Sequence, residues 1–316
     1  MELIVKQLRG RFIDDFQLPI TTVEDPYFEK RIKLLEEDFG ANTKYLVLLE
    51  TIRDNFGGNM QKFLEHRHSV KDKILSDILN SEGYKNMLAD KSPLDDYKPI
   101  VASRELYTEE QDGGLFVSYD MIKANFQALR YIDPSIVRDC ETWEKFVSHY
   151  SDVEYLASAK QVRQEVLGKL NGKRLSAIEK RVSNEFAKEF SQRLGIYGFE
   201  PFSIKTDEII FKFNGSEAQF ESFKGSNEEF NGFKFRFNKF KLNMRTFKRG
   251  FSDKRINVFE KEDFLNAHRR ILKCVPAEYY PQVYKLLNGI EINDSDLVFS
   301  TNHELCKFMK PIELVK

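Results

Sequence analysis

The chain has 316 residues, of which 41% are hydrophobic and 31% charged, and its formal net charge is −1. This composition is typical of a globular protein in water. It argues against a membrane protein, because no apolar run approaches the roughly 18 residues that a spanning helix needs. A net charge near zero also argues against a protein that coats nucleic acid uniformly.

The N-terminal segment and the cysteines favour an intracellular protein, cytoplasmic or nuclear. The first residues contain no apolar core of the kind that a signal peptide needs. Cys140, Cys274 and Cys306 lie far apart and form no Cys-x-x-Cys pair. We therefore expect reduced thiols and no structural zinc.

The first 95 residues are predicted to be mostly helical. Apolar positions recur at helical spacing over residues 28–35 and 45–52, and Gly57-Gly58 marks a break between helices. Residues 96–112 are mostly polar and predict a connector to the next part of the chain.

Residues 115–120 form the first predicted strand, an apolar run that ends on Asp120. A helix is expected over residues 122–130, and a proline shortly afterwards ends it. Residues 141–195 predict a run of helices, the longest from about residue 175 to residue 194.

The apolar pattern then changes to a period of two, which predicts strands over residues 199–213 and 233–247. The tight Thr206-Asp207-Glu208 segment divides the first of these regions into a hairpin. Helices are expected again over residues 264–272 and 279–287. This order of elements defines an α+β protein with an antiparallel sheet in its second half and flanking helices.

Two acidic sites lie at the ends of predicted strands that are far apart in the sequence. Asp120 ends the first strand, and Asp207 and Glu208 lie at the tip of the later hairpin. Adjacent strands can bring such ends together, and carboxylates are ligands that Mg²⁺ or Mn²⁺ prefers. The pattern predicts a site for two divalent ions. The alternative is that Asp120 caps the following helix and Asp207 only forms the turn.

Residues 231–255 carry nine lysine or arginine residues against one acidic residue, Asp253. Phenylalanines alternate with the bases and can pack on the opposite face. The stretch predicts one electropositive groove that binds nucleic acid. Its candidate contacts are Lys234, Arg236, Lys239, Lys241 and Arg245. The alternative is a solvated ribbon whose lysines protect the edge of a sheet.

The segment from residue 118 to residue 126 resembles the first palm motif of the family B DNA polymerases, which add nucleotides to a primer on a template. That motif is a strand ending in aspartate, followed by a short helix that carries an aromatic residue near the sugar. The resemblance implies that Asp120 binds metal and that Asn125 and Phe126 lie near the sugar of the nucleotide.

The segment from Lys160 to Gly168 is similar to the second motif of that family, Lys-x-x-x-Asn-x-x-Tyr-Gly, with Gln164 for the asparagine and Leu167 for the tyrosine. By resemblance, Lys160 and Arg163 contact the triphosphate of the incoming nucleotide. Gln164 and Gly168 belong to the same nucleotide site, where the glycine lets the backbone approach the new base pair.

The third motif of the family is a hairpin with Asp-Thr-Asp at its turn, and the chain has Lys205-Thr206-Asp207-Glu208 there. Asp207 takes the place of the second aspartate, and a lysine replaces the first. The resemblance makes Asp120, Asp207 and Glu208 the catalytic carboxylates, with Asp120 and Asp207 as metal ligands. In the family a lysine-rich strand follows and grips the primer, and residues 233–241 are its counterpart.

The resemblance implies three parts of the chain. They are a helical N-terminal region (1–111), a palm-like domain (112–257) with a short helical fingers insertion at about 134–195, and a helical thumb-like region (258–316). Residues 1–95 do not resemble the exonuclease of the family. The implied protein is a minimal nucleotidyltransferase without proofreading, which uses Mg²⁺ or Mn²⁺, nucleoside triphosphates and a primer–template. Such a short chain would suit a virus or a mobile element.

Departures from the family pattern leave two other functions open. Lys205, the replaced asparagine and tyrosine, and the spacing of only about 40 residues between the first two motifs favour a non-catalytic nucleic-acid-binding or scaffold protein with a degenerate palm. A nuclease would use the same carboxylates and would also bind metal. DNA and RNA remain equal candidates for template and product.

Overall fold

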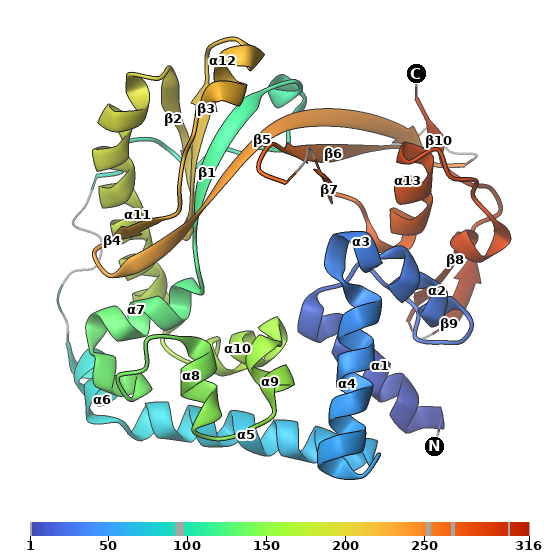
Figure 1. Ribbon diagram of the computed structural model, residues 1–316, viewed down its shortest axis with the longest axis horizontal. Helices are drawn as coiled ribbons and strands as arrows, with labels where there is room; N and C mark the ends of the chain where they lie inside the picture. The colour runs from blue at the N-terminus through green and yellow to red at the C-terminus, as the bar shows by residue number, and fades with distance from the viewer. Residues whose placement is uncertain are drawn as a thin grey trace.

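The computed structural model describes residues 2–90, 92, 98–250, 254–266, 269–302 and 304–315. Within them, helices come first, followed by one strand, a second group of helices, a group of strands and a mixed C-terminal segment. This order confirms the α+β class, the helical N-terminal region and the antiparallel sheet (Figure 1). No helix in the described part combines the length and the apolar character needed to cross a lipid bilayer.

The N-terminal region is helical up to Ala89, and its longest helix, α5, runs along one side of the molecule (Figure 1). The helices are α1 (Glu2–Phe16), α2 (Tyr27–Leu34), α3 (Glu36–Phe39), α4 (Ala41–Phe56), α5 (Met60–Asn80) and α6 (Glu82–Ala89). Gly57 ends α4 with a left-handed φ of 58°, and Asn59 then caps α5 by accepting a hydrogen bond from the backbone N–H of Lys62. The break predicted at the glycine pair is confirmed. The predicted connector includes residues 96–97, which lie outside the described residues.

The second half of the chain forms an eight-stranded antiparallel sheet in the order β2-β3-β1-β5-β6-β7, with β4 and β10 paired to β5. The strands are β1 (Leu115–Met121), β2 (Phe199–Ile204), β3 (Glu208–Phe213), β4 (Glu228–Phe230), β5 (Phe233–Lys248), β6 (Arg255–Asp263), β7 (Arg269–Lys273) and β10 (Glu313–Leu314). The predicted strands over 115–120, 199–213 and 233–247 are confirmed. Strand β1 lies in the centre, between β3 and β5, although these strands follow it by more than 80 residues in the sequence.

The chain between β1 and β2 is helical, as predicted, and its longest helix packs on one face of the sheet. Its helices are α7 (Ala124–Ile132), α8 (Trp143–Ser148), α9 (Glu154–Ser158), α10 (Lys160–Leu167) and α11 (Gly172–Gly195), and α12 (Glu217–Ser222) follows β3. Tyr119 of β1 packs against Phe186 and Phe190 of α11 at ring-centroid distances of 5.0 and 5.5 Å. Because side chains alternate along a strand, Asp120 lies on the opposite face of the sheet.

The C-terminal region over residues 258–316 is not helical as expected: most of its described elements are strands, with a single short α-helix. Residues 264–266 form a turn and β7 begins at Arg269, so the helix expected over residues 264–272 is wrong; residues 267–268 lie outside the described residues. Pairing with the neighbouring strand β6 overrides a local pattern that fits either element. The predicted helix over 279–287 is confirmed as α13 (Tyr280–Leu287), and a small hairpin of β8 (Val298–Thr301) and β9 (Glu304–Lys307) follows it.

The C-terminal segment also contacts the N-terminal helices, as Figure 1 shows for α13 and β8 beside α2 and α3. Arg31 of α2 forms a buried ion pair with Asp296 at 3.1 Å, and it donates to the backbone carbonyls of Ser295 and Val298. Lys285 of α13 lies 2.6 Å from the other oxygen of Asp296. The Arg31 contacts join two parts of the chain that lie more than 260 residues apart.

Candidate functional site

The end of β1 meets the turn between β2 and β3. In the antiparallel register, Asp120 lies directly opposite Glu208 of β3 on one side and opposite Arg236 of β5 on the other. The backbone N–H of Met121 donates to the carbonyl of Asp207 at 2.7 Å, which fixes the hairpin turn against the end of β1. The structure thus brings the backbone positions of the three predicted carboxylates next to one another.

A cavity of about 410 Å³ opens at this point. Its walls include two of the carboxylates, one side chain of the basic strand and several residues predicted to bind the nucleotide: Asp120, Asn125, Lys160, Arg163, Gln164, Asp207 and Arg236. The three segments that resemble polymerase motifs therefore line one cavity. Helix α10 supplies the cationic side opposite the carboxylates.

The carboxylates repel one another. The pKa of Asp120 is raised to about 6, first by burial and then by the negative charges of Glu208 and Asp207. The positive charges of Arg236 and Lys160 act in the opposite direction without cancelling the shift. A divalent cation between Asp120 and Asp207 would relieve this repulsion.

The donor set fits a magnesium-like ion. The described residues contain no cluster of three or more His, Cys, Asp or Glu side chains arranged to hold a metal. Mg²⁺ does not need such a cluster, because it keeps several waters and is usually held by one or two carboxylates together with substrate phosphates. Asp120 and Asp207 supply this number of hard oxygen ligands, and Glu208 stands next to Asp120.

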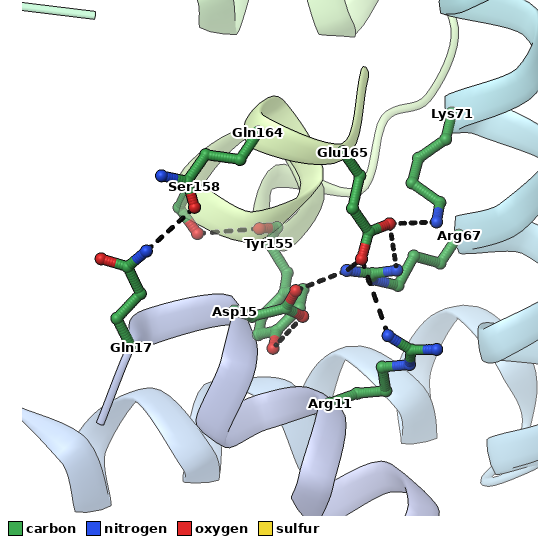
Figure 2. A network of polar contacts seen from close by, with 9 residues as sticks. All are labelled: Arg11, Asp15, Gln17, Arg67, Lys71, Tyr155, Ser158, Gln164 and Glu165. Atoms are coloured by element: carbon green, nitrogen blue, oxygen red, sulfur yellow. Dashed lines mark hydrogen bonds and ion pairs between the residues drawn. The ribbon is translucent and has the colours of Figure 1, made fainter. Parts of the chain in front are cut away.

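Helix α10 holds its polar side chains through contacts with the N-terminal helices, shown in Figure 2. Gln17, just after α1, accepts a hydrogen bond from Lys160 Nζ at 2.7 Å and donates to Gln164 Oε1 at 2.9 Å. On the other side of α10, Glu165 pairs with Arg67 and Lys71 of α5. The cationic wall of the cavity is therefore attached to residues that the sequence did not connect with the site.

Two predicted nucleotide contacts lie elsewhere. Phe126 is only 1% exposed and packs against Trp143 and Phe146 in the core, so the aromatic residue does not line the cavity and the neighbouring Asn125 does. Gly168 ends α10 outside the cavity lining. An added Cβ there would lie 2.7 Å from the carbonyl oxygen of Gln164, so the packing of the helix end accounts for this glycine.

The basic residues of β5 do not form one groove. Lys234 and Arg236 alternate onto the face of Asp120, whereas Lys239, Lys241 and Arg245 lie on the other face. Lys239 is 4% exposed, and its ammonium donates to the backbone carbonyls of Glu221 and Phe223. The remaining two pair with acidic side chains: Lys241 with Glu217 and Arg245 with Glu260. The prediction of a single groove is wrong. Arg236 and Lys239 are three residues apart on β5, and an odd separation places their side chains on opposite faces of the sheet.

Sequence reasoning missed Glu179 on α11. This side chain is 4% exposed, and its Oε1 has no hydrogen-bond partner among the described residues. Its pKa is raised to about 8 by burial and, to a smaller extent, by the charge of Asp207. A signal was present in the sequence, because Glu179 lies on the same helical stripe as the buried Leu175, Val182 and Phe186.

Comparison with known proteins gives no match. No protein-family model fits the sequence, no curated protein is significantly similar to it, and no solved structure is significantly similar to its fold.

Proposed function

We propose that the chain is a divalent-metal-dependent nucleotidyltransferase that extends the 3′ end of a nucleic acid, with β1, β3 and β5 forming its palm-like centre. One observation carries the proposal. A single cavity joins Asp120 and Asp207, from strands far apart in the sequence, with Lys160 and Arg163 on a facing helix. Nucleotidyl transfer needs this combination, because charge develops on the phosphates and must be stabilised from both sides.

In this proposal the acidic residues of the cavity bind the metal ion and the basic residues bind the triphosphate. Asp120 and Asp207 hold the cation, which supplies Lewis-acid stabilisation of phosphate charge. Lys160 and Arg163 lie one turn apart on one side of α10 and neutralise the negative charge of the triphosphate. The guanidinium of Arg163 is half-buried, which lowers its pKa and strengthens its interaction with an anion that enters the cavity. Asn125 lies at the cavity on the side of α7.

The resemblance to family B DNA polymerases supports this proposal through the order of the three motifs along the chain. The strand with Asp120, the helix with Lys160 and the hairpin with Asp207 occur in that order, and all three reach the same cavity. Lys234 and Arg236, exposed on the face of Asp120, are the basic residues of β5 available to a nucleic-acid backbone near the cavity.

A non-catalytic nucleic-acid-binding protein is the second candidate, and Arg236 is the observation that favours it. Arg236 lies directly opposite Asp120 and offsets part of its negative charge without a metal ion. Lys205, at the base of the hairpin turn, adds another positive charge where the family has an aspartate. In this second function the cavity would bind phosphate groups and perform no chemistry.

A primer-extension assay tests the proposal. A labelled primer–template is incubated with Mg²⁺ or Mn²⁺ and with deoxy- and ribonucleotides in separate reactions. We expect the unmodified protein to lengthen the primer, and Asp120→Ala and Asp207→Ala to reduce the rate by about 100-fold or more, because each removes a metal ligand. Asp54→Ala, an exposed aspartate paired with Arg53, is the matched control and should extend at the normal rate.

Three results would contradict the proposal. Normal extension by both site variants would place the activity elsewhere. A bound primer that stays intact and unextended would favour the non-catalytic candidate. Shortening of the primer in the presence of metal would identify a nuclease.

A further inference from the structure

We propose that Gln17 is a positioning residue that holds Lys160 and Gln164 in place for the phosphates of the incoming nucleotide. This inference rests on the function proposed above and extends its site to the N-terminal region. Gln17 lies 143 residues before Lys160 and belongs to none of the segments that resemble polymerase motifs. Its amide is the one group in the described structure that bonds both side chains.

The chemistry of the three side chains fixes the orientation of the Gln17 amide. An ammonium only donates hydrogen bonds, so the oxygen of Gln17 must face Lys160 Nζ, at 2.7 Å. The nitrogen of Gln17 then points to Gln164 and donates to its oxygen at 2.9 Å. Lys160 and Gln164 are four residues apart and therefore lie on the same side of α10. One amide thus restrains two side chains that both line the cavity.

The backbone around Gln17 is itself held in position. The residue has a left-handed φ of 50°, and its N–H donates to Asp14 at 3.1 Å while the next N–H donates to Ile13 at 3.0 Å. Two residues earlier, Asp15 forms a buried ion pair with Arg67 at 2.6 Å and accepts a hydrogen bond from Tyr155 (Figure 2). Since these contacts tie the end of α1 to α5 and α9, the backbone that carries Gln17 is held beside Lys160.

A neutral partner suits this role better than a carboxylate. An acidic side chain at position 17 would neutralise Lys160, whereas an amide leaves the full positive charge for an anionic ligand. The restraint removes side-chain freedom that a flexible lysine would otherwise lose when a nucleotide binds. We therefore infer that Gln17 raises the affinity for the triphosphate without taking part in the chemical step.

Direct nucleotide binding tests the inference. A nucleoside triphosphate is titrated calorimetrically into the unmodified protein, Gln17→Ala, Gln17→Glu, Lys160→Ala and the Gln17→Ala/Lys160→Ala double variant. Mg²⁺ is present, together with a primer–template whose primer lacks the 3′-hydroxyl, so that binding is measured without extension. We expect Gln17→Ala to weaken binding about three- to tenfold and to raise KM with little change in kcat. In the double variant, the Gln17 substitution should have a clearly smaller effect, because only its contact with Gln164 is left to lose.

Two further variants distinguish a loss of nucleotide binding at the site from a general effect of substituting an exposed glutamine. Gln17→Glu keeps a hydrogen-bond acceptor for Lys160 but cancels its charge, so it should also weaken binding. Gln61→Ala removes an exposed glutamine that bonds to Glu65 and should bind nucleotide normally. All single variants should unfold at the temperature of the unmodified protein, since Gln17, Gln61 and Lys160 are all exposed.

The outcomes distinguish this inference from the function on which it rests. If the unmodified protein binds nucleotide and extends a primer while Gln17→Ala behaves identically, only the inference is wrong. Equal losses for Gln17→Ala with and without Lys160 would also overturn it, because a purely structural effect is additive. If the unmodified protein neither binds nucleotide nor extends a primer, both fail together.

Discussion

Glu179 shows how burial and charge act together at a single residue near the site. Its carboxyl group is buried on α11, and the neighbouring charge of Asp207 further disfavours ionisation. With a pKa of about 8, the group is mostly protonated at neutral pH in the folded protein. In the unfolded chain the same group would titrate near its ordinary value of 4.5.

This difference predicts a pH-dependent cost to stability. A raised pKa means that the folded state binds more protons between about pH 4.5 and 8, so the free energy of unfolding falls as the pH rises through this window. Glu179→Gln removes the titration. We expect the variant to gain about 2 kcal/mol or more relative to the unmodified protein on going from pH 5 to pH 8. Urea unfolding at both pH values measures this, and an equal difference at pH 5 and pH 8 would contradict it.

Single residues also show what the sequence could and could not predict. Asp120 and Asp207 are recognisable in the sequence because the first ends an apolar strand and the second lies at the tip of a hairpin, and β-pairing brings the two positions together. The prediction that Lys239 contacts nucleic acid uses its positive charge alone. It ignores that an odd number of residues separates Lys239 from Arg236, so the two side chains lie on opposite faces of β5. Gln17 was not predictable, because nothing local indicates that a helix end will lie beside α10.

At the scale of elements, α10 depends on an ionic network that crosses from α1 to α5 (Figure 2). Asp15 and Arg67 are 1% and 4% exposed, and their side chains lie 2.6 Å apart. Glu165 of α10 joins the network through Arg67 at 3.2 Å and also contacts Arg11 at 3.6 Å. The position of the cationic helix is therefore set by buried charges in the N-terminal region.

Removing the central cation of this network should be costly. Arg67→Ala leaves the buried Asp15 without its ion-pair partner, with only the Tyr155 hydroxyl still donating to it. We expect a loss of about 3–5 kcal/mol in the free energy of unfolding, as is typical when one member of a buried pair is removed. Arg53→Ala, at an exposed ion pair, should change stability by less than about 1 kcal/mol. Similar unfolding midpoints for the two variants would show that the ionic network does not contribute this much to the free energy of unfolding.

The elements were predictable to different degrees. Long periodic segments such as α11 and β5 have enough repeats to define their type from sequence alone. The turn and strand after β6 have a short apolar pattern that fits helix and strand equally, and the open edge of β6 decides the outcome through pairing. Long-range pairing of this kind is not encoded in any one segment.

At the scale of the whole molecule, the N-terminal helices and the C-terminal segment hold each other. Arg31 and Asp296 are each 4% exposed at their side chains, and Lys285 adds a second cation to Asp296. Close by, Asp38 of α3 contacts Arg269 of β7 and Tyr280 of α13. The same N-terminal region thus supports α10 on one side and the C-terminal segment on the other.

Breaking the contact at Arg31 should loosen the C-terminal segment. Arg31→Ala removes the ion pair and two hydrogen bonds to backbone carbonyls of the segment around β8. We expect faster amide hydrogen exchange in residues 294–301, measured by mass spectrometry, while the central strands β1 and β3 keep their protection. Lys30→Ala, the exposed neighbour, should leave exchange unchanged. Unchanged protection at 294–301 in Arg31→Ala would contradict this role.

The central claim is that Asp120 and Asp207 together hold a divalent cation beside a cationic helix. The most direct test is Mn²⁺ binding, followed by electron paramagnetic resonance, for the unmodified protein and for Asp120→Ala, Asp207→Ala and Asp54→Ala. We expect the unmodified protein and Asp54→Ala to bind Mn²⁺ equally, and each of the other two variants to bind it at least about tenfold more weakly. Mn²⁺ binding that is the same in all four proteins, or absent from the unmodified protein even with nucleotide present, would contradict the account.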